Sequence, residues 1–235
     1  MLTAIRGHRG PPAFPAGRLP VYIPEKAKGS RQHGDGVGMV RAGLTTDRVV
    51  AAAADLADSI GFDKVTISAL ARGFGVKDAS LYSHVRNLQD LRTRVALLAA
   101  GEFIDRIEAA VAGRAGRDAL IAFADAYRSF ALECPGRYEA TRMRVDPAVV
   151  AAAPAYHRTI ATTSSILRAY GLTEPDLTDA VRLLRSTFHG FTALEADGGF
   201  AAPRAVQTSW ERAVEALHFL LANWPSAVGG TAREE

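Results

Sequence analysis

The sequence predicts an all-α fold, in which a small N-terminal helical domain is joined by a long helix to a larger helical domain. From Thr45 onward, apolar residues recur at three- and four-residue spacing, as they do on one face of a helix. Glycines and prolines separate these periodic segments, and alanine, the strongest helix former, is abundant. No segment shows a convincing strand pattern, and no internal repeat is visible.

The composition indicates a globular chain. Of its 235 residues, 48% are hydrophobic and 23% are charged, which is typical of a protein with a buried core. The single cysteine, Cys134, has no second cysteine with which to form an internal disulfide or a thiolate metal cluster. No stretch reaches the roughly 18–20 apolar residues of a membrane helix, and no apolar leader segment is visible. We therefore expect a cytoplasmic protein.

Residues 1–43 are predicted to form a disordered basic tail that is rich in glycine and proline. They contain seven Arg and Lys residues against Glu25 and Asp35, a balance of +5 in a chain of net charge +3. Three interpretations remain open: the tail adds sequence-independent affinity for a polyanion, it has no role, or the true start is Met39. Residues 226–235 are expected to form a second disordered tail.

The N-terminal domain, residues 44–92, is predicted to contain three helices and the start of a long fourth helix. Thr46 is expected to cap the first helix, which ends at Gly61. Thr66 is expected to cap a short second helix, which ends at a glycine-containing turn.

The third helix is expected over 78–84, and Asn87 is expected to cap the fourth, whose apolar stripe fades near Gly113. The larger domain, residues 93–225, holds the rest of this long helix. Its further helices are predicted at about 117–133, 153–170, 176–196 and 203–223.

A short helix, a tight turn and a second short helix within residues 64–94 form the pattern of a helix-turn-helix, which places its second helix in the major groove of DNA. Gly75 permits the bend, and Val76, Leu81 and Val85 are expected to point inward and hold the two helices together. The segment has a local charge of +4, which suits a polyanion. The residues expected to contact DNA are Thr66, Ser68, Lys77, Asp78, Ala79, Ser80, Tyr82, Ser83, His84 and Arg86.

Several of these residue types have a defined use at DNA. Lys77 can reach a phosphate or a guanine, Ser80 can bond to a base or a phosphate, and Ala79 can contact a thymine methyl group. Asp78 opposes the charge of DNA unless it accepts from a cytosine amine or caps the helix. Hydrogen bonds to backbone phosphates are expected from Tyr82, His84, Arg86 and Thr66.

This region resembles the DNA-binding domain of TetR-family transcriptional regulators. The resemblance rests on the run Val65-Thr66-Ile67-x-x-Leu70-Ala71-x-x-Phe74-Gly75-Val76-x-x-x-Ser80-Leu81-Tyr82-x-His84-Val85-x-Asn87-Leu88-x-x-Leu91. Three residues depart from the commonest family pattern: Lys77, Val85 and Leu88, the last of which replaces a frequent phosphate-binding lysine. In the C-terminal part, Phe188-His189-Gly190 resembles the motif of a TetR-like C-terminal domain of the Trp-His-Gly type, with Phe188 in place of tryptophan.

The resemblance implies a homodimer whose last two long helices form a four-helix interface, a palindromic double-stranded DNA operator and a cavity for a small-molecule effector in the C-terminal domain. It also implies repression. We hypothesise that the effector relieves repression by moving the long helix at 87–112, and we expect association with the bacterial nucleoid while DNA is bound. Candidate pocket residues, each of which core packing also explains, are Phe123, Tyr127, Phe130, Tyr138, Arg142, Phe188 and Phe191.

Catalytic motifs are missing from the sequence. It has no histidine pair at metal-ligand spacing, no Gly-x-Ser-x-Gly elbow, no phosphate-binding loop and no dinucleotide fingerprint. We therefore expect neither an enzyme nor a bound cofactor or metal. The alternative function is a helical protein-interaction module without specific DNA binding, which would need no recognition helix of small and polar residues.

Overall fold

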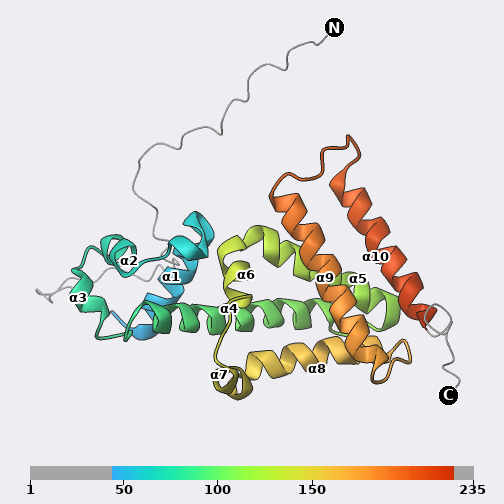
Figure 1. Ribbon diagram of the computed structural model, residues 1–235, viewed down its shortest axis with the longest axis horizontal. Helices are drawn as coiled ribbons and strands as arrows, with labels where there is room; N and C mark the ends of the chain where they lie inside the picture. The colour runs from blue at the N-terminus through green and yellow to red at the C-terminus, as the bar shows by residue number, and fades with distance from the viewer. Residues whose placement is uncertain (1–43, 225–235) are drawn as a thin grey trace, which may run out of the picture. The chain divides into compact units, whose positions relative to one another are not determined.

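The computed structural model describes residues 44–224, so both predicted tails, 1–43 and 226–235, lie outside the described residues. Figure 1 shows that these residues fold into helices joined by short loops, and no strand occurs among them, which confirms the all-α prediction. The helices are α1 (Thr46–Ile60), the 3-10 helix η1 (Phe62–Lys64), α2 (Ile67–Phe74), α3 (Asp78–Leu81), α4 (Leu88–Val111), α5 (Gly116–Glu133), α6 (Pro135–Thr141), α7 (Pro147–Ala152), α8 (Pro154–Arg168), α9 (Asp176–Ala196) and α10 (Val206–Ala222).

The first hydrophobic core is formed by α1, α2, α3 and the first half of α4. Two predicted caps are confirmed here, because the Thr66 hydroxyl accepts from the backbone N–H of Ala69 (3.1 Å) and the Asn87 side chain accepts from that of Asp90 (2.8 Å). Each cap satisfies a backbone donor that the helix itself leaves unpaired. The side chains buried in this core include Val49, Ala53, Phe62, Leu70, Leu81, Leu91 and Val95.

Two predicted boundaries are wrong. The cap of α1 is Thr45, whose side chain accepts from the Arg48 N–H, while Thr46 donates its hydroxyl to the carbonyl oxygen of His84 (3.4 Å). Helix α3 ends at Leu81 and not at His84, because the following residues form a turn that brings Val85 into the core and leads to α4.

Helix α4 contributes to two hydrophobic cores in succession (Figure 1). Its first half packs against α1 and buries Leu91 and Val95 in the N-terminal core, and its second half buries Ile104 and Ile107 in the C-terminal core. A displacement of α4 would therefore disturb the packing of both cores.

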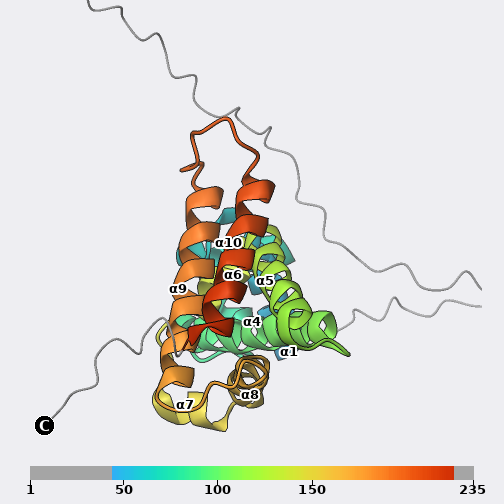
Figure 2. The same cartoon turned by 90° about the vertical axis from the view of Figure 1, so that its right-hand side faces the viewer.

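The C-terminal core is formed by the second half of α4 with α5, α8, α9 and α10, and the last two helices lie side by side and antiparallel (Figure 2). Its centre is aromatic, since the ring of Phe188 lies 5.7 Å from that of Phe123 and 5.5 Å from that of Trp210. The four predicted helices of this region are present, with bounds that differ by up to three residues. None of the helices between residues 44 and 224 has the length and apolar character needed to cross a membrane.

The sequence prediction missed α6 and α7. It interprets Pro135-Gly136 and Pro147 as breaks between helices, but each proline is the first residue of a helix. At that position the missing N–H costs nothing and the fixed φ favours the helix.

Helix α6 packs directly against the backbone of α1 at Gly136. A Cβ atom on this residue would lie 2.1 Å from both the carbonyl carbon and the carbonyl oxygen of Ala57, and 2.5 Å from the backbone nitrogen of Asp58. These are backbone atoms, which cannot move aside as a side chain can. Only glycine therefore permits this close approach.

Polar contacts fix the orientation of α6 on α1 and α4. The Arg137 backbone N–H donates to Asp58 (2.8 Å), and its guanidinium pairs with Asp58, with Asp55 (2.6 Å) and with Glu102 of α4 (2.8 Å). The carboxylate of Glu139 accepts from the backbone N–H of Phe62 (3.1 Å). These contacts join α6 to the N-terminal helices.

We expect Gly136→Ala to lower the free energy of unfolding by about 3 kcal/mol, because the added methyl group forces α6 away from α1. Gly101→Ala, within α4, is the matched control: a Cβ there meets no atom within 4 Å, so the substitution should stabilise the helix by about 1 kcal/mol. Urea unfolding measures both changes. Equal effects of the two substitutions would show that the close approach of α6 to α1 does not contribute to stability.

Candidate DNA interface

The turn between α2 and α3 has the geometry of a helix C-terminus that is closed by glycine. Gly75 has φ 66° and ψ 30°, in the left-handed region, and the Val76 N–H donates to the carbonyl of Ala71 (3.0 Å). Residues with a Cβ rarely adopt this conformation, which explains the glycine. The turn sets the direction in which α3 leaves α2.

A side-chain hydrogen bond joins the two helices. The Ser68 hydroxyl, near the start of α2, donates to the carboxylate of Asp78, the first residue of α3. Asp78 also lies in the first turn of α3, where the helix dipole favours a negative charge. This contact gives Asp78 a structural role and accounts for an acidic residue beside a predicted DNA-binding face.

Helix α3 has a buried side and an exposed side. Leu81 and Val85 are buried in the N-terminal core, as predicted. The prediction that Val76 points inward is wrong: its side chain is 38% exposed, because the reversal at Gly75 places it outside the core. Tyr82 is 54% exposed, although it directly follows the fully buried Leu81.

Thr66 and Ser68 lie at the start of α2, and the other eight predicted DNA contacts lie between the end of α2 and the start of α4. All ten are exposed except His84, which is half-buried. Ser83 donates its hydroxyl to the carbonyl of Ser80 (2.8 Å), which stabilises the turn after α3. The exposed side chains of α3 and its flanks are Lys77, Asp78, Ala79, Ser80, Tyr82 and Ser83.

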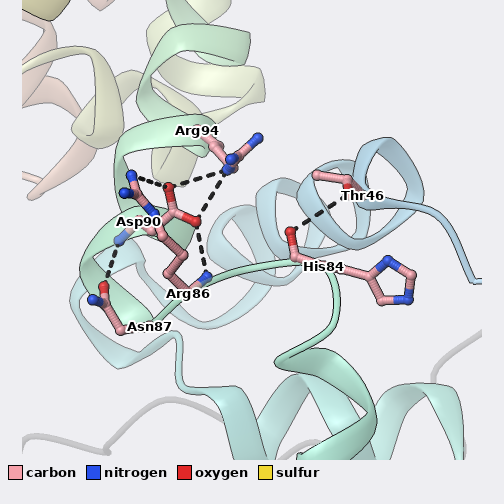
Figure 3. A network of polar contacts seen from close by, with 6 residues as sticks. All are labelled: Thr46, His84, Arg86, Asn87, Asp90 and Arg94. Carbon is pink, nitrogen blue, oxygen red and sulfur yellow. Dashed lines mark hydrogen bonds and ion pairs between the residues drawn. The ribbon is translucent and has the colours of Figure 1, made fainter.

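An ionic network anchors the segment that joins α3 to α4 (Figure 3). The carboxylate of Asp90 accepts from the Arg86 N–H (3.0 Å), from the Arg86 guanidinium (3.4 Å) and from Nε of Arg94 (3.2 Å), and its own N–H donates to Asn87. Burial alone would raise the pKa of Asp90, but the Arg86 N–H and the Arg94 guanidinium outweigh it and lower that pKa. The Arg86 side chain is 85% exposed, so it remains accessible to a phosphate.

Sequence reasoning missed the roles of Thr46, Asp90 and Arg94 in holding this segment. Asn87-x-x-Asp90 at the start of an apolar stripe is the spacing of a capping pair, and this signal could have identified Asp90. The Thr46 contact with His84 spans 38 residues and has no local signature.

The candidate pocket residues lie in and around the C-terminal core. Tyr127 and Tyr138 pack edge to face, Phe191 is half-buried, and Arg142 is exposed. Two surface clefts, of about 410 Å³ between α5 and α10 and about 320 Å³ beside Gly199–Phe200, include none of the candidates. No group of three or more His, Cys, Asp or Glu within residues 44–224 is arranged to hold a metal ion. The buried candidates are Phe123, Tyr127, Phe130, Tyr138 and Phe188.

Asp90→Asn should lower the free energy of unfolding by about 1 to 2 kcal/mol at pH 7, because it removes charge-assisted bonds to Arg86 and Arg94. The pKa of Asp90 is lower in the folded state than in the unfolded state. The carboxylate therefore stabilises the folded protein fully above the unfolded pKa of about 4, and this stabilisation is lost as the pH falls through the folded pKa. Urea unfolding between pH 7 and pH 2 should therefore show the variant and the wild type converging at acid pH.

Asp47→Asn is the matched control, because Asp47 is an exposed carboxylate in the first turn of α1. We expect it to change the free energy of unfolding by no more than about 0.5 kcal/mol. An Asp90→Asn effect that is as small as that of the control, or that persists unchanged at pH 2, would contradict this role of Asp90.

Comparison with known proteins agrees with this geometry. Residues 120–217 match the family model described as a tetracyclin repressor-like C-terminal domain. The chain is 38% identical over 161 residues to the uncharacterized HTH-type transcriptional regulator Rv0681 of Mycobacterium tuberculosis, with 67% of this chain and 72% of the relative covered. It is 35% identical over 160 residues to the uncharacterized HTH-type transcriptional regulator YobS of Bacillus subtilis, with 68% and 83% covered.

A solved structure of BioQ with its double-stranded DNA operator has the same fold. The TM-score is 0.55 at 23% identity, and the alignment covers 77% of this chain and 99% of BioQ. The exposed second helix of the helix-turn-helix, the C-terminal domain match and the two relatives together lead to one conclusion. The chain belongs to the TetR family of helix-turn-helix transcriptional regulators.

Proposed function

We propose that this protein binds double-stranded DNA by placing α3 in the major groove. The observation that carries the proposal is the two-sided character of α3 and its flanking residues. Leu81 and, beyond the helix, Val85 are buried, while Ser80 and the two cap residues Lys77 and Tyr82 face solvent. A short helix with a fixed inner side and an exposed side of small and polar residues suits the reading of base edges.

The charge of the segment supports the same function. Residues 64–94 contain six Arg and Lys residues against Asp78 and Asp90. Both carboxylates accept hydrogen bonds within the protein, Asp78 from Ser68 and Asp90 from the Arg86 and Arg94 side chains. The exposed groups of this surface are therefore mainly donors and cations, which attract phosphates. BioQ, which has the same fold, was solved with a DNA operator.

We further propose a homodimer that is formed through α9 and α10 and that reads a palindromic operator. Phe219 on α10 is 70% exposed and Leu194 on α9 is 51% exposed, although both are large apolar residues. Covering such residues with a second copy removes apolar surface from water. Two-fold symmetry would then present two copies of α3 to successive major grooves.

The proposed regulation is repression that a small-molecule effector relieves from the C-terminal domain, with no catalytic step. Helix α6 can transmit a change in the C-terminal domain to the N-terminal domain. Arg137 and Glu139 bind the N-terminal helices, while Tyr138 is buried in the C-terminal core. A shift of α6 or α4 would change the separation of the two copies of α3 in a dimer. The coupling between the two sites is reciprocal. Operator DNA should therefore weaken effector binding by the factor by which the effector weakens DNA binding.

Selection of bound fragments from the genome that encodes the protein should enrich a palindromic sequence. The double variant Tyr82→Ala/His84→Ala should lose about tenfold or more in affinity for that sequence, because two side chains suited to phosphates are removed. Arg168→Ala, at an exposed residue of α8, is the control and should bind as the wild type does. Enrichment of no DNA by the folded wild-type protein would overturn the proposal in favour of a protein-interaction module.

Sedimentation velocity should show a dimer for the wild type and a monomer for Phe219→Arg, because a charge at the proposed interface cannot be buried without a partner. Ile160→Arg is the matched control, since Ile160 on α8 is equally exposed, at 67%. We expect this variant to remain dimeric. Dissociation by Ile160→Arg and not by Phe219→Arg would place the interface on α8 and contradict the proposal.

A further inference from the structure

A chain of three hydrogen-bonding side chains runs from the C-terminal core to its surface. The Tyr138 hydroxyl lies 2.8 Å from the hydroxyl of Tyr127 and 2.9 Å from Nδ1 of His189. Both tyrosines are buried, at 8% exposure, and His189 is half-buried. The chain joins α5, α6 and α9 at one point, and it is not needed for the DNA-binding surface.

Two arginines flank the outer end of this chain. Arg142 follows Tyr138 by one helical turn, and its guanidinium carbon lies 6.0 Å from the centre of the Tyr138 ring. Arg185 precedes His189 by one turn of α9, so the two side chains share a face of that helix. Both arginines are exposed.

Neither arginine has a carboxylate partner within residues 44–224. Other arginines that connect helices in this domain do have one: Arg128 pairs with Glu195 and Arg158 with Glu108. Two positive charges on one short stretch of surface repel each other unless an anion lies between them.

His189 adds a hydrogen-bond donor to the two cations. Burial lowers the pKa of its imidazole, and the charges of Arg142 and Arg185 lower it further, so the ring is neutral at pH 7. In the tautomer in which the Tyr138 hydroxyl donates to Nδ1, the proton of the neutral ring lies on Nε2. This atom has no partner in the described part of the chain and is not enclosed by it. It is therefore free to donate to a ligand.

We propose that Arg142, Arg185 and His189 recognise the carboxylate of an organic anion, and that this is the chemical class of the effector. Guanidinium groups bind a planar carboxylate through paired hydrogen bonds, and an imidazole N–H adds a third. The inference rests on the proposed function, in which an effector acts from the C-terminal domain. It adds the class of ligand and its point of contact.

The position of the site connects it with the DNA-binding domain. Tyr138 and Arg142 belong to α6 and its C-terminal cap, and Arg137 of the same helix pairs with Asp58 of α1. An anion bound by Arg142 and Arg185 pulls the end of α6 toward α9. Such a movement would act on the helix that contacts both cores.

The test titrates the full chain with acetate, benzoate and octanoate, each against its neutral amide, while NMR follows the ¹⁵N resonances of the His189 imidazole. These resonances are assigned by their loss in His189→Gln. We expect at least one carboxylate to shift them saturably and its amide to leave them unchanged. Arg142→Gln and Arg185→Gln should each weaken that binding by about tenfold, which corresponds to about 1.4 kcal/mol.

Arg168→Gln, which removes an exposed arginine on α8, is the control and should bind the carboxylate as the wild type does. Three results would overturn the inference: no response to any carboxylate, equal responses to carboxylate and amide, or full affinity in both arginine variants. Inorganic phosphate is a further arm, and binding of phosphate as tight as that of every carboxylate would overturn the organic class. None of these results would change the enrichment of operator DNA from the genome. A failure of this inference is therefore distinguishable from a failure of the proposed DNA-binding function.

Discussion

The contact between α6 and the backbone of α1 is the constraint on which the rest of the structure depends. Gly136 permits the approach, and the Arg137 guanidinium forms ion pairs with carboxylates of α1 and α4 from the same turn of α6. The next residue, Tyr138, is buried in the C-terminal core, whereas Ala140 is buried in the N-terminal core. One seven-residue helix therefore contacts both cores, beside the long helix α4 that contributes to each of them.

The DNA-binding surface depends on this arrangement through α1 and α4. Thr46 of α1 holds the carbonyl of His84, and the Asp90 network at the start of α4 holds Arg86. These two contacts fix His84 and Arg86 in the segment that joins α3 to α4. The direction of α3 is fixed at its other end by the Gly75 turn and the Ser68–Asp78 bond. A helix of four residues has little stability of its own, so its orientation comes from these neighbours.

The features that could be predicted from the sequence are those with a local cause. Thr66 and Asn87 cap their helices because a side-chain oxygen one position before a helix accepts hydrogen bonds from its first unpaired N–H groups. The turn at the end of α2 is equally predictable, because a glycine after a helix is typical of a left-handed C-terminal cap. Tertiary contacts carry no such signal. Pro135-Gly136 has the sequence of a break, and only the nearness of Ala57, far away in the chain, explains its glycine. The sequence pattern predicts that Val76 helps to hold the two helices together, but the Gly75 turn places its side chain outside the core. The individual DNA contacts and the pocket residues remain predictions.

The central claim is that α6 joins the two cores into one cooperative unit, and a comparison of two probes during unfolding tests it most directly. Both tryptophans of the chain, Trp210 and Trp224, are buried in the C-terminal core, so their fluorescence reports that core alone. Hydrogen exchange of the α1 and α2 amides reports the N-terminal core. In urea the two probes should give one transition with the same midpoint. Loss of protection in α1 and α2 at a urea concentration where the tryptophan signal is still native would contradict the claim.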